Sequence, residues 1–147
     1  MPQASGTVFD EDYVIDSNAK IVGTGNLNGR INAVKGDFFK SVPANGDCYI
    51  LKYILHNWND EQCKVILENI RKESKSGTKL IVFDDLLDDS ADTSYMKVLD
   101  CLFMSVFSGK MRTESEMKLL LQSCGFHVQR VIRPANCFSA ITEATAN

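Results

Sequence analysis

The sequence DCYILKYIL at residues 47–55 decides the fold of this chain. Apolar side chains run through it almost without interruption, and Gly46 stands just before it. A continuous apolar run of this length is typical of a strand that is buried on both faces of a parallel sheet. KLIVF at residues 79–83 has the same character. We therefore predict two buried strands at these positions.

A helix is predicted between these two strands. Asn59 stands where an N-cap belongs, and Gln62 three residues later completes a variant of the capping box. Apolar residues then recur at helical spacing at positions 63, 66, 67 and 70. Thr113 and Glu116 form a second capping box, and Gly125 ends the helix that it opens.

Shorter segments with strand or helix periodicity lie at residues 7–9, 13–22, 30–35, 94–107, 127–132 and 137–142. The segments at 13–22 and 94–107 have helical spacing, and the last two segments form strands joined by a turn. This order predicts an α/β fold with a mostly parallel sheet, helices on both faces and a C-terminal antiparallel hairpin. No repeat, low-complexity tract or linker divides the chain, so residues 1–147 are predicted to form one domain.

The composition excludes several classes of protein. Of 147 residues, 44% are hydrophobic and 24% are charged, which excludes a disordered or fibrous chain. The net charge is −3 and the charges are scattered, so we expect no nucleic-acid partner. No apolar run approaches the roughly 18 residues that span a bilayer, and the first residues lack the pattern of a secretory leader. We therefore expect a cytoplasmic protein without a membrane partner.

Five cysteines stand at positions 48, 63, 101, 124 and 137. They are widely spaced, and no two form a Cys-x-x-Cys pair. Each lies in an apolar context, which indicates buried, reduced thiols rather than a disulfide framework or a zinc site. We therefore predict no metal site.

Polar residues follow the predicted strands of the sheet. Asp10, Asp37 and His56 follow the first three strands, and Asp84 and Asp85 follow the fourth. Ligands of open α/β sheets bind beyond the carboxyl ends of the strands. Carboxylates there can accept hydrogen bonds from the hydroxyls of a nucleoside, although aspartate is also common wherever a strand turns into a loop. These residues are therefore candidates for a binding site.

His56 is the candidate base, because it lies at a predicted strand-to-helix junction. A neutral imidazole there can accept a proton from a hydroxyl near pH 7. The alternative is a half-buried histidine whose ring is satisfied by a backbone carbonyl. His127 starts a late strand and is expected on the surface. The glycines of residues 23–29 lack the spacing of a nucleotide loop and follow a helix, so they predict a turn.

Five stretches of the chain carry a resemblance to a known family. They are GTVFDEDYVI at 6–15, GDFFKSVP at 36–43, LKYILHNWNDEQ at 51–62, KLIVFDDLL at 79–87 and SGKMRTESEMKLLLQSCGF at 108–126. Together they resemble the C-terminal catalytic domain of small-molecule S-adenosylmethionine-dependent O-methyltransferases, the family of the caffeic-acid and hydroxyindole enzymes. The resemblance implies a Rossmann-like sheet and S-adenosylmethionine as the cofactor. It also implies methyl transfer to a hydroxyl of a small aromatic molecule.

The resemblance implies roles for individual residues on the cofactor side. Asp10 matches the aspartate with which the family binds the ribose of the cofactor. Asp37 and Phe38 fall on the segment that contacts the adenine, and Lys52 matches a lysine that lies beside the cofactor. These four residues are therefore expected to bind S-adenosylmethionine.

On the substrate side, His56 matches the family's general base, which deprotonates the acceptor hydroxyl. Asp84 matches the acidic residue that holds this histidine, although plant members usually carry glutamate there. Asp100 and Met104 fall where the family places contacts with the substrate. A carboxylate beside the imidazole would fix its orientation and stabilise its protonated form, which agrees with general-base chemistry.

One position departs from the family's pattern. Where the family carries a second acidic residue before Arg-Thr, this chain has Met111. A thioether is a weak acceptor for an imidazolium, so the support of His56 is weakened unless Asp84 or Glu114 compensates. The alternative to an enzyme is therefore a catalytically inactive methyltransferase-like module that serves as a binding or regulatory partner.

Two parts of the family pattern have no counterpart in this sequence. They are the glycine-rich cofactor loop and the N-terminal domain through which the family forms homodimers. The family's first strand would lie between the strands at 7–9 and 47–55, so the resemblance implies an incomplete sheet. We expect these 147 residues alone to bind S-adenosylmethionine weakly or not at all, and to associate through exposed strand edges.

Overall fold

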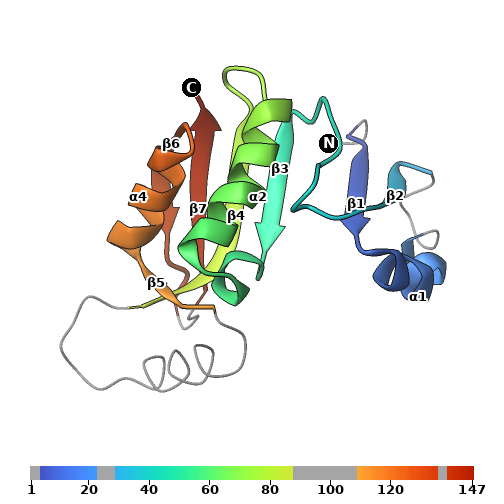
Figure 1. Cartoon of the computed structure of the whole chain (residues 1–147), viewed down its shortest axis with the longest axis horizontal. Helices are drawn as coiled ribbons and strands as arrows, with labels where there is room; N and C mark the ends of the chain where they lie inside the picture. Colours follow the sequence, from blue (N-terminus) through green and yellow to red (C-terminus); the bar gives the residue numbers. More distant parts are fainter. Residues whose placement is uncertain (1–3, 23–28, 88–108, 136–138) are drawn as a thin grey trace. The chain divides into compact units, whose positions relative to one another are not determined.

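A computed structural model describes residues 4–22, 29–87, 109–135 and 139–147 of the chain (Figure 1). The chain divides into two compact units, Met1–Ala44 and Asn45–Asn147. Each unit has a sheet of its own. A single domain over the whole chain stays a prediction, and the predicted helix at 94–107 lies outside the described residues. Among the described residues, no helix is long and apolar enough to cross a membrane.

The first unit is a strand–helix–strand arrangement. β1 (Gly6–Asp10) and β2 (Ile31–Lys35) pair in parallel, and α1 (Asp12–Val22) lies between them in the chain. These elements confirm the strands and the helix predicted there. Gly36 follows β2 in close contact with Phe9, since a Cβ atom at Gly36 would lie 2.5 Å from the Phe9 ring. A larger residue would therefore displace that ring.

The second unit contains a mixed sheet with the strand order β3-β4-β7-β6. Its strands are β3 (Cys48–Lys52), β4 (Lys79–Leu87), β5 (Arg112–Thr113), β6 (Phe126–Ile132) and β7 (Ser139–Ala146). β3 is parallel to β4, and the short β5 is parallel to the end of β4. β7 is antiparallel to both β4 and β6. The predicted α/β class, parallel pairing and C-terminal hairpin are confirmed.

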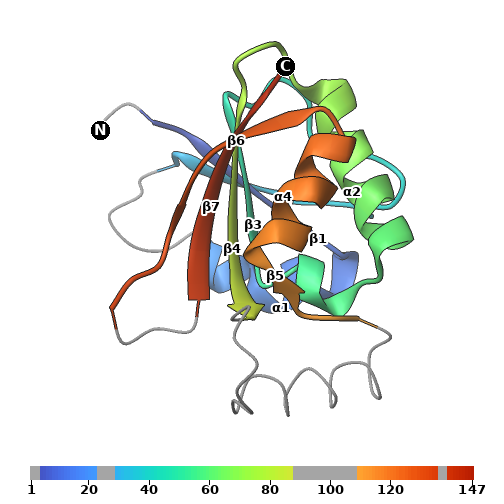
Figure 2. The ribbon, with the colours of Figure 1, turned by 90° about the vertical axis from the view of Figure 1, so that its left-hand side faces the viewer.

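Helices α2 (Asp60–Glu73) and α4 (Glu114–Ser123) cover one face of this sheet (Figure 2). Both begin with the predicted capping boxes, because the side chain of Asn59 and that of Thr113 each accept from the backbone three residues on. α4 is followed by Gly125 at φ 82°, in the left-handed region that favours glycine. The sequence signals at the start of both helices and after the end of α4 are therefore confirmed.

The core of the second unit lies between this sheet face and its two helices. Leu80, Val82 and Leu86 alternate along β4 and are all buried. The apolar stripe predicted for α2 is buried against them, at Cys63, Ile66, Leu67 and Ile70. Burying an aliphatic side chain of this size stabilises a fold by about 1.5–3 kcal/mol. The second unit therefore has a packed core of its own.

The prediction that residues 47–55 form a strand buried on both faces is wrong for β3. Ile50 is 61% exposed, and Cys48 and Lys52 on the same face are exposed too. The physical reason is position, because β3 pairs only with β4 among the described strands and so lies at the sheet edge. The exposure of Cys48 also corrects the expectation that every cysteine is buried, whereas Cys63 and Cys124 are buried and free.

Candidate active site

A short turn places His56 at the carboxyl end of β3. Tyr53 adopts a positive φ of 55° there, and its N–H still donates to the Phe83 carbonyl of β4 at 2.9 Å. The 3-10 turn η1 (Leu55–Asn57) follows, and the Leu55 side chain anchors it in the core with no exposed surface. The turn leads directly into the cap of α2. His56 is therefore held between two regular elements.

His56 and Asp84 form a buried pair. The imidazole Nδ1 lies 2.5 Å from Asp84 Oδ1, and the His56 backbone N–H donates to Asp84 Oδ2 at 3.1 Å. The two residues are only 9% and 2% exposed. Both carboxylate oxygens thus hold one residue, which fixes the ring orientation. With Nδ1–H donating to Asp84, Nε2 is the nitrogen that can accept a proton.

The environment raises the pKa of His56 above its ordinary value. Burial disfavours the charged imidazolium and is the largest influence, but the Asp84 hydrogen bond and the charges of Asp84 and Asp85 together outweigh it. The charge of Arg112 acts in the opposite direction and lowers this pKa. The site therefore stabilises the imidazolium that forms when His56 accepts a proton.

The structure also decides which acidic residue supports His56. Glu114 pairs with Lys118 at 2.6 Å and with Arg133 at 3.5 Å. Asp84, by contrast, contacts both the ring and the backbone of His56. Met111 is buried, at 2% exposed. Of the two compensating residues that the sequence left open, the structure brings Asp84 to the histidine.

Asp10 and Asp37 lie at the carboxyl edge of the β1–β2 pair. Asp10 ends β1 and its Oδ1 accepts from the Glu11 N–H at 2.8 Å. The Gly36 N–H donates to the Asp10 carbonyl at 3.0 Å, so the two strand ends are joined just before Asp37. The structure therefore places these two predicted carboxylates at one edge of the first unit.

Asp37 is held as a carboxylate by its neighbours. Its Oδ1 accepts from the Phe39 N–H at 2.9 Å, and Lys40 Nζ lies 3.2 Å from Oδ2. These two contacts lower the pKa of Asp37, the backbone hydrogen bond being the larger cause. The ring of Phe38 packs edge-on against that of Phe39 at 5.0 Å between centroids. The ionised carboxylate of Asp37 therefore belongs to a residue that is followed directly by the aromatic ring of Phe38.

The other predicted site residues are less informative. Lys52 is the exposed last residue of β3, and its Nζ lies 5.6 Å from the centroid of the Tyr53 ring. Asp100 and Met104 lie outside the described residues. His127 is exposed on β6, as predicted.

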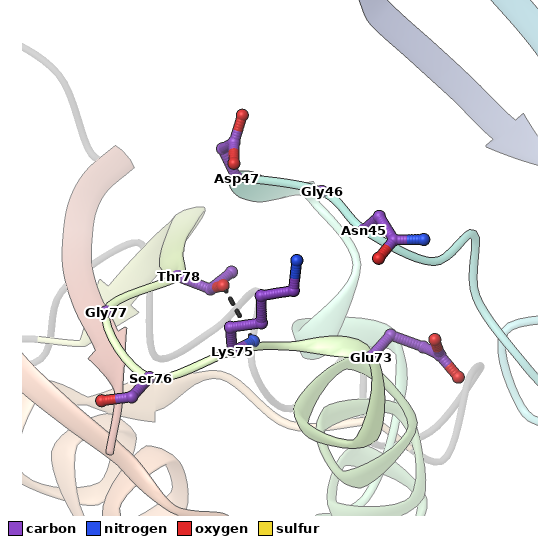
Figure 3. Close-up of a pocket in the computed structure, with 8 residues that line it drawn as sticks. All are labelled: Asn45, Gly46, Asp47, Glu73, Lys75, Ser76, Gly77 and Thr78. Carbon is purple, nitrogen blue, oxygen red and sulfur yellow. Dashed lines mark hydrogen bonds between the residues drawn. The ribbon is translucent and has the colours of Figure 1, made fainter.

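A cavity of about 280 Å³ lies at the other end of the second sheet (Figure 3). Its lining includes Asp47 and Thr78, which come just before the first residues of β3 and β4, whereas His56 follows the end of β3. The Lys75 N–H donates to Thr78 Oγ1 at 3.1 Å and closes the loop between α2 and β4 (Figure 3). This cavity is therefore a feature of the loops and is separate from the His56 site.

Gly109 was not singled out in the sequence. A Cβ atom at this position would lie 2.1 Å from the His56 carbonyl oxygen and 2.6 Å from the Asn57 carbonyl carbon. Backbone at Gly109 therefore packs directly on the turn that carries His56, and any other residue would force them apart. The buried Arg112 was also missed, since a single arginine in a sequence gives no sign of burial.

Comparisons with known proteins identify the family of this chain. Residues 1–127 match the family described as O-methyltransferase domain. The chain belongs to the O-methyltransferase family. It is 42% identical over 130 residues to O-methyltransferase 12 of Dictyostelium discoideum, covering 88% of this chain and 35% of that protein. It is 39% identical over 129 residues to Probable inactive O-methyltransferase 11 of the same organism, covering 88% of this chain and 38% of that protein.

Solved structures of O-methyltransferases share the fold. The crystal structure of human N-acetylserotonin methyltransferase in complex with SAM matches 99% of this chain and 41% of that chain. The TM-score is 0.87 and the sequence identity is 27%. This O-methyltransferase chain thus spans about two fifths of the length of the proteins that it matches.

Proposed function

We propose that this chain forms the C-terminal part of the catalytic site of an S-adenosylmethionine-dependent O-methyltransferase. The acceptor is the hydroxyl of a small aromatic molecule, and His56 is the general base. The observation that carries the proposal is the buried His56–Asp84 pair at the carboxyl end of a parallel strand. Membership of the O-methyltransferase family supports the same reaction class.

Methyl transfer to a hydroxyl requires a base and a close alignment of the acceptor oxygen with the methyl group. It does not require a nucleophilic side chain. The sulfonium of S-adenosylmethionine supplies an activated methyl group and departs as a neutral thioether. His56 Nε2 accepts the proton of the acceptor hydroxyl as that oxygen bonds to carbon. Asp84 Oδ1 keeps the proton on Nδ1 and stabilises the imidazolium, while Oδ2 holds the His56 backbone N–H.

The cofactor side of the proposal rests on the first unit. Asp10 and Asp37 present carboxylates at one strand edge, and such groups accept hydrogen bonds from ribose hydroxyls and from an adenine amino group. Phe38 offers an aromatic surface beside Asp37. These groups fit a nucleoside, and the similar human enzyme is in complex with SAM. Lys52 is proposed to lie beside the cofactor.

Two further parts of the proposal concern partners. Asp100 and Met104 are proposed to contact the substrate, and the whole protein is proposed to form homodimers as the family does. A similar O-methyltransferase, from neocarzinostatin biosynthesis, is in complex with 1,4-dihydroxy-2-naphthoic acid in its crystal structure. This aromatic ligand carries hydroxyl groups, which supports a small hydroxylated acceptor for this chain too.

The test uses the two histidines of the chain as a matched pair. In the whole protein, His56→Ala should lower kcat by about 10²–10⁴-fold, while the Kd for S-adenosylmethionine stays within about twofold. His127→Ala, on the exposed strand β6, should leave both values unchanged. Transfer of labelled methyl groups and calorimetry measure the two quantities. Turnover of His56→Ala at the parent's rate between about pH 6 and pH 9 would remove His56 as the base.

A second candidate function is a catalytically inactive module that binds the cofactor or a partner. Two observations favour it: Met111 stands where an acidic residue is expected, and one similar protein is named a probable inactive O-methyltransferase. The same calorimetry and transfer assay distinguish the two functions. Binding of S-adenosylmethionine without methyl transfer to any of a panel of phenols would support the inactive module.

A further inference from the structure

We propose that Arg112 is a positioning residue for His56, because its buried guanidinium holds both ends of the turn that carries the imidazole. This inference rests on the proposed role of His56 as the base. Arg112 lies in β5 and is only 2% exposed, yet it is separated from the His56 turn by more than 50 residues of sequence. A fully charged side chain in such a place needs partners for its donors.

Two of these partners are backbone carbonyls on either side of His56. Nη1 donates to the Leu55 carbonyl at 2.8 Å, and Nη2 donates to the Trp58 carbonyl at 3.0 Å. One carbonyl precedes His56 and the other follows Asn57, so a single planar group joins the start and the end of the turn. The guanidinium thereby fixes the backbone from which the imidazole projects.

The other side of the guanidinium is fixed by α2. Asp60 Oδ1 accepts from Nε at 2.9 Å and from Nη2 at 2.7 Å, and Lys110 Nζ lies 3.3 Å from Asp60 Oδ2. Burial tends to raise the pKa of Asp60, but the contacts with Arg112 and Lys110 outweigh this and lower it. The Cys63 sulfur accepts a further bond from Nη2 at 3.3 Å. Arg112 thus ties the His56 turn to the first turns of α2.

The residues just before Arg112 complete the arrangement. The backbone at Gly109 packs on the His56 carbonyl so closely that a Cβ atom would lie 2.1 Å away. Residues 109–112 therefore contact the turn twice, by packing at Gly109 and by hydrogen bonds from Arg112. Two independent contacts from one short segment limit both the position and the rotation of the turn.

Lysine could not replace this arginine. The guanidinium presents five N–H donors in a rigid plane, whereas an ammonium is a point charge on a flexible stem. In the structure the donors go to three backbone carbonyls, those of Leu55, Trp58 and Lys110, to the Asp60 carboxylate and to the Cys63 sulfur. Arg112→Lys keeps the charge but loses the planar fork, so it separates positioning from electrostatics.

The charge of Arg112 has a second consequence. Among the described residues, the charges that act on the pKa of His56 are those of Asp84 and Asp85 of β4 and Arg112 of β5, and the centroid of the Tyr53 ring lies 5.8 Å from that of the imidazole. The two aspartates favour the imidazolium, and Arg112 opposes them. Arg112 therefore keeps more of the imidazole in the neutral form that accepts a proton.

The experiment is NMR on the full 147-residue chain, in which the imidazole signals come from only two histidines. In Arg112→Lys, amide hydrogen exchange at residues 55–58 should increase about tenfold more than exchange at Leu80 in the core of β4. In Arg112→Met, which removes the charge, the His56 titration should move to higher pH. The His127 titration is the internal reference in every sample.

Two further variants keep the test decisive. Asp60→Asn retains Arg112 but removes its charged anchor, so it should change exchange at residues 55–58 in the same direction and less strongly, even if Arg112→Met does not fold. Arg130→Lys makes the same replacement in the exposed pair with Glu143, where only the two-pronged guanidinium contact is lost, and should change nothing at the turn. Folded Arg112→Lys and Asp60→Asn with unchanged exchange at residues 55–58 would overturn the proposal.

In the whole protein, Arg112→Lys should lower kcat about tenfold and leave the Kd for S-adenosylmethionine unchanged. The NMR result and the activity of His56→Ala are independent of each other. If His56→Ala stays active, the proposed function fails, and the exchange data still decide whether Arg112 holds the turn. If exchange at the turn is unchanged, only the role of Arg112 fails.

Discussion

The two units of the chain differ in what holds their site residues. Among the described side chains of the first unit, Ile15 is the only apolar one that is buried, at 6% exposed, whereas the second unit has a continuous core beneath α2 and α4. The side chains of Asp10 and Asp37 make the contacts described above with residues one to three positions away. His56 contacts Asp84, 28 residues on, and Arg112 reaches Asp60 across 52 residues.

This difference indicates which part of the proposed site has to be held rigidly. A general base must be held within a fraction of an ångström of the proton that it accepts, and only a packed core with long-range contacts supplies that. Ribose and adenine contacts tolerate a lighter framework, because a flexible cofactor can adjust to the carboxylates. His56, the proposed base, lies on the unit that has this packed core.

The largest expected difference between the units is in how much the removal of an apolar side chain lowers the free energy of unfolding. Leu67 in α2 has no exposed surface, so Leu67→Ala should lower the free energy of unfolding of the second unit by about 2–5 kcal/mol. Val8 in β1 is 43% exposed, and Val8→Ala should cost less than about 1 kcal/mol. Urea denaturation followed by the single tryptophan, Trp58, reports the second unit, and hydrogen exchange reports the first. Equal losses for both variants would contradict the comparison.

The second expected effect is smaller, and it is on the affinity for the cofactor, which we assign to the first unit. Asp10→Ala in the whole protein should weaken binding of S-adenosylmethionine by about 1.5–3 kcal/mol, the scale of a charge-assisted hydrogen bond. Asp16→Ala is the matched control, since it removes another aspartate of the first unit, one that pairs with Lys35. Calorimetry measures both. An unchanged Kd for Asp10→Ala would remove this residue from the cofactor site.

The smallest expected effect is a pH dependence that belongs to the second unit. The pKa of His56 is raised in the folded chain, so its stabilising contribution is present below the unfolded pKa of about 6.5 and is lost as pH rises through the folded value. Asp84→Asn removes the charge that raises this pKa and should flatten that slope. Urea midpoints between about pH 5 and pH 9 measure it. A slope that is the same in both proteins would show that Asp84 is not the cause.

Much of the fold could be predicted because its signals are local. The capping boxes at Asn59 and Thr113 and the turn at Gly125 depend on residues within one helical turn of each other. The periodicity of α2 and the apolar run of β4 depend on spacing alone. His56 could be placed at a strand end by the same local reasoning, and the resemblance to O-methyltransferases supplied its expected partner.

Tertiary structure alone decided the rest. The apolar run at 47–55 predicts a strand, but its exposure depends on which strands pair beside it, and among the described strands β3 pairs with β4 alone. The choice of Asp84 over Glu114 as the partner of His56, and the contact of Arg112 with the same turn, depend on how β4, β5 and α2 pack. Sequence determines local conformation through hydrogen bonds a few residues apart, whereas partners that are dozens of residues apart meet only when the core brings their elements together.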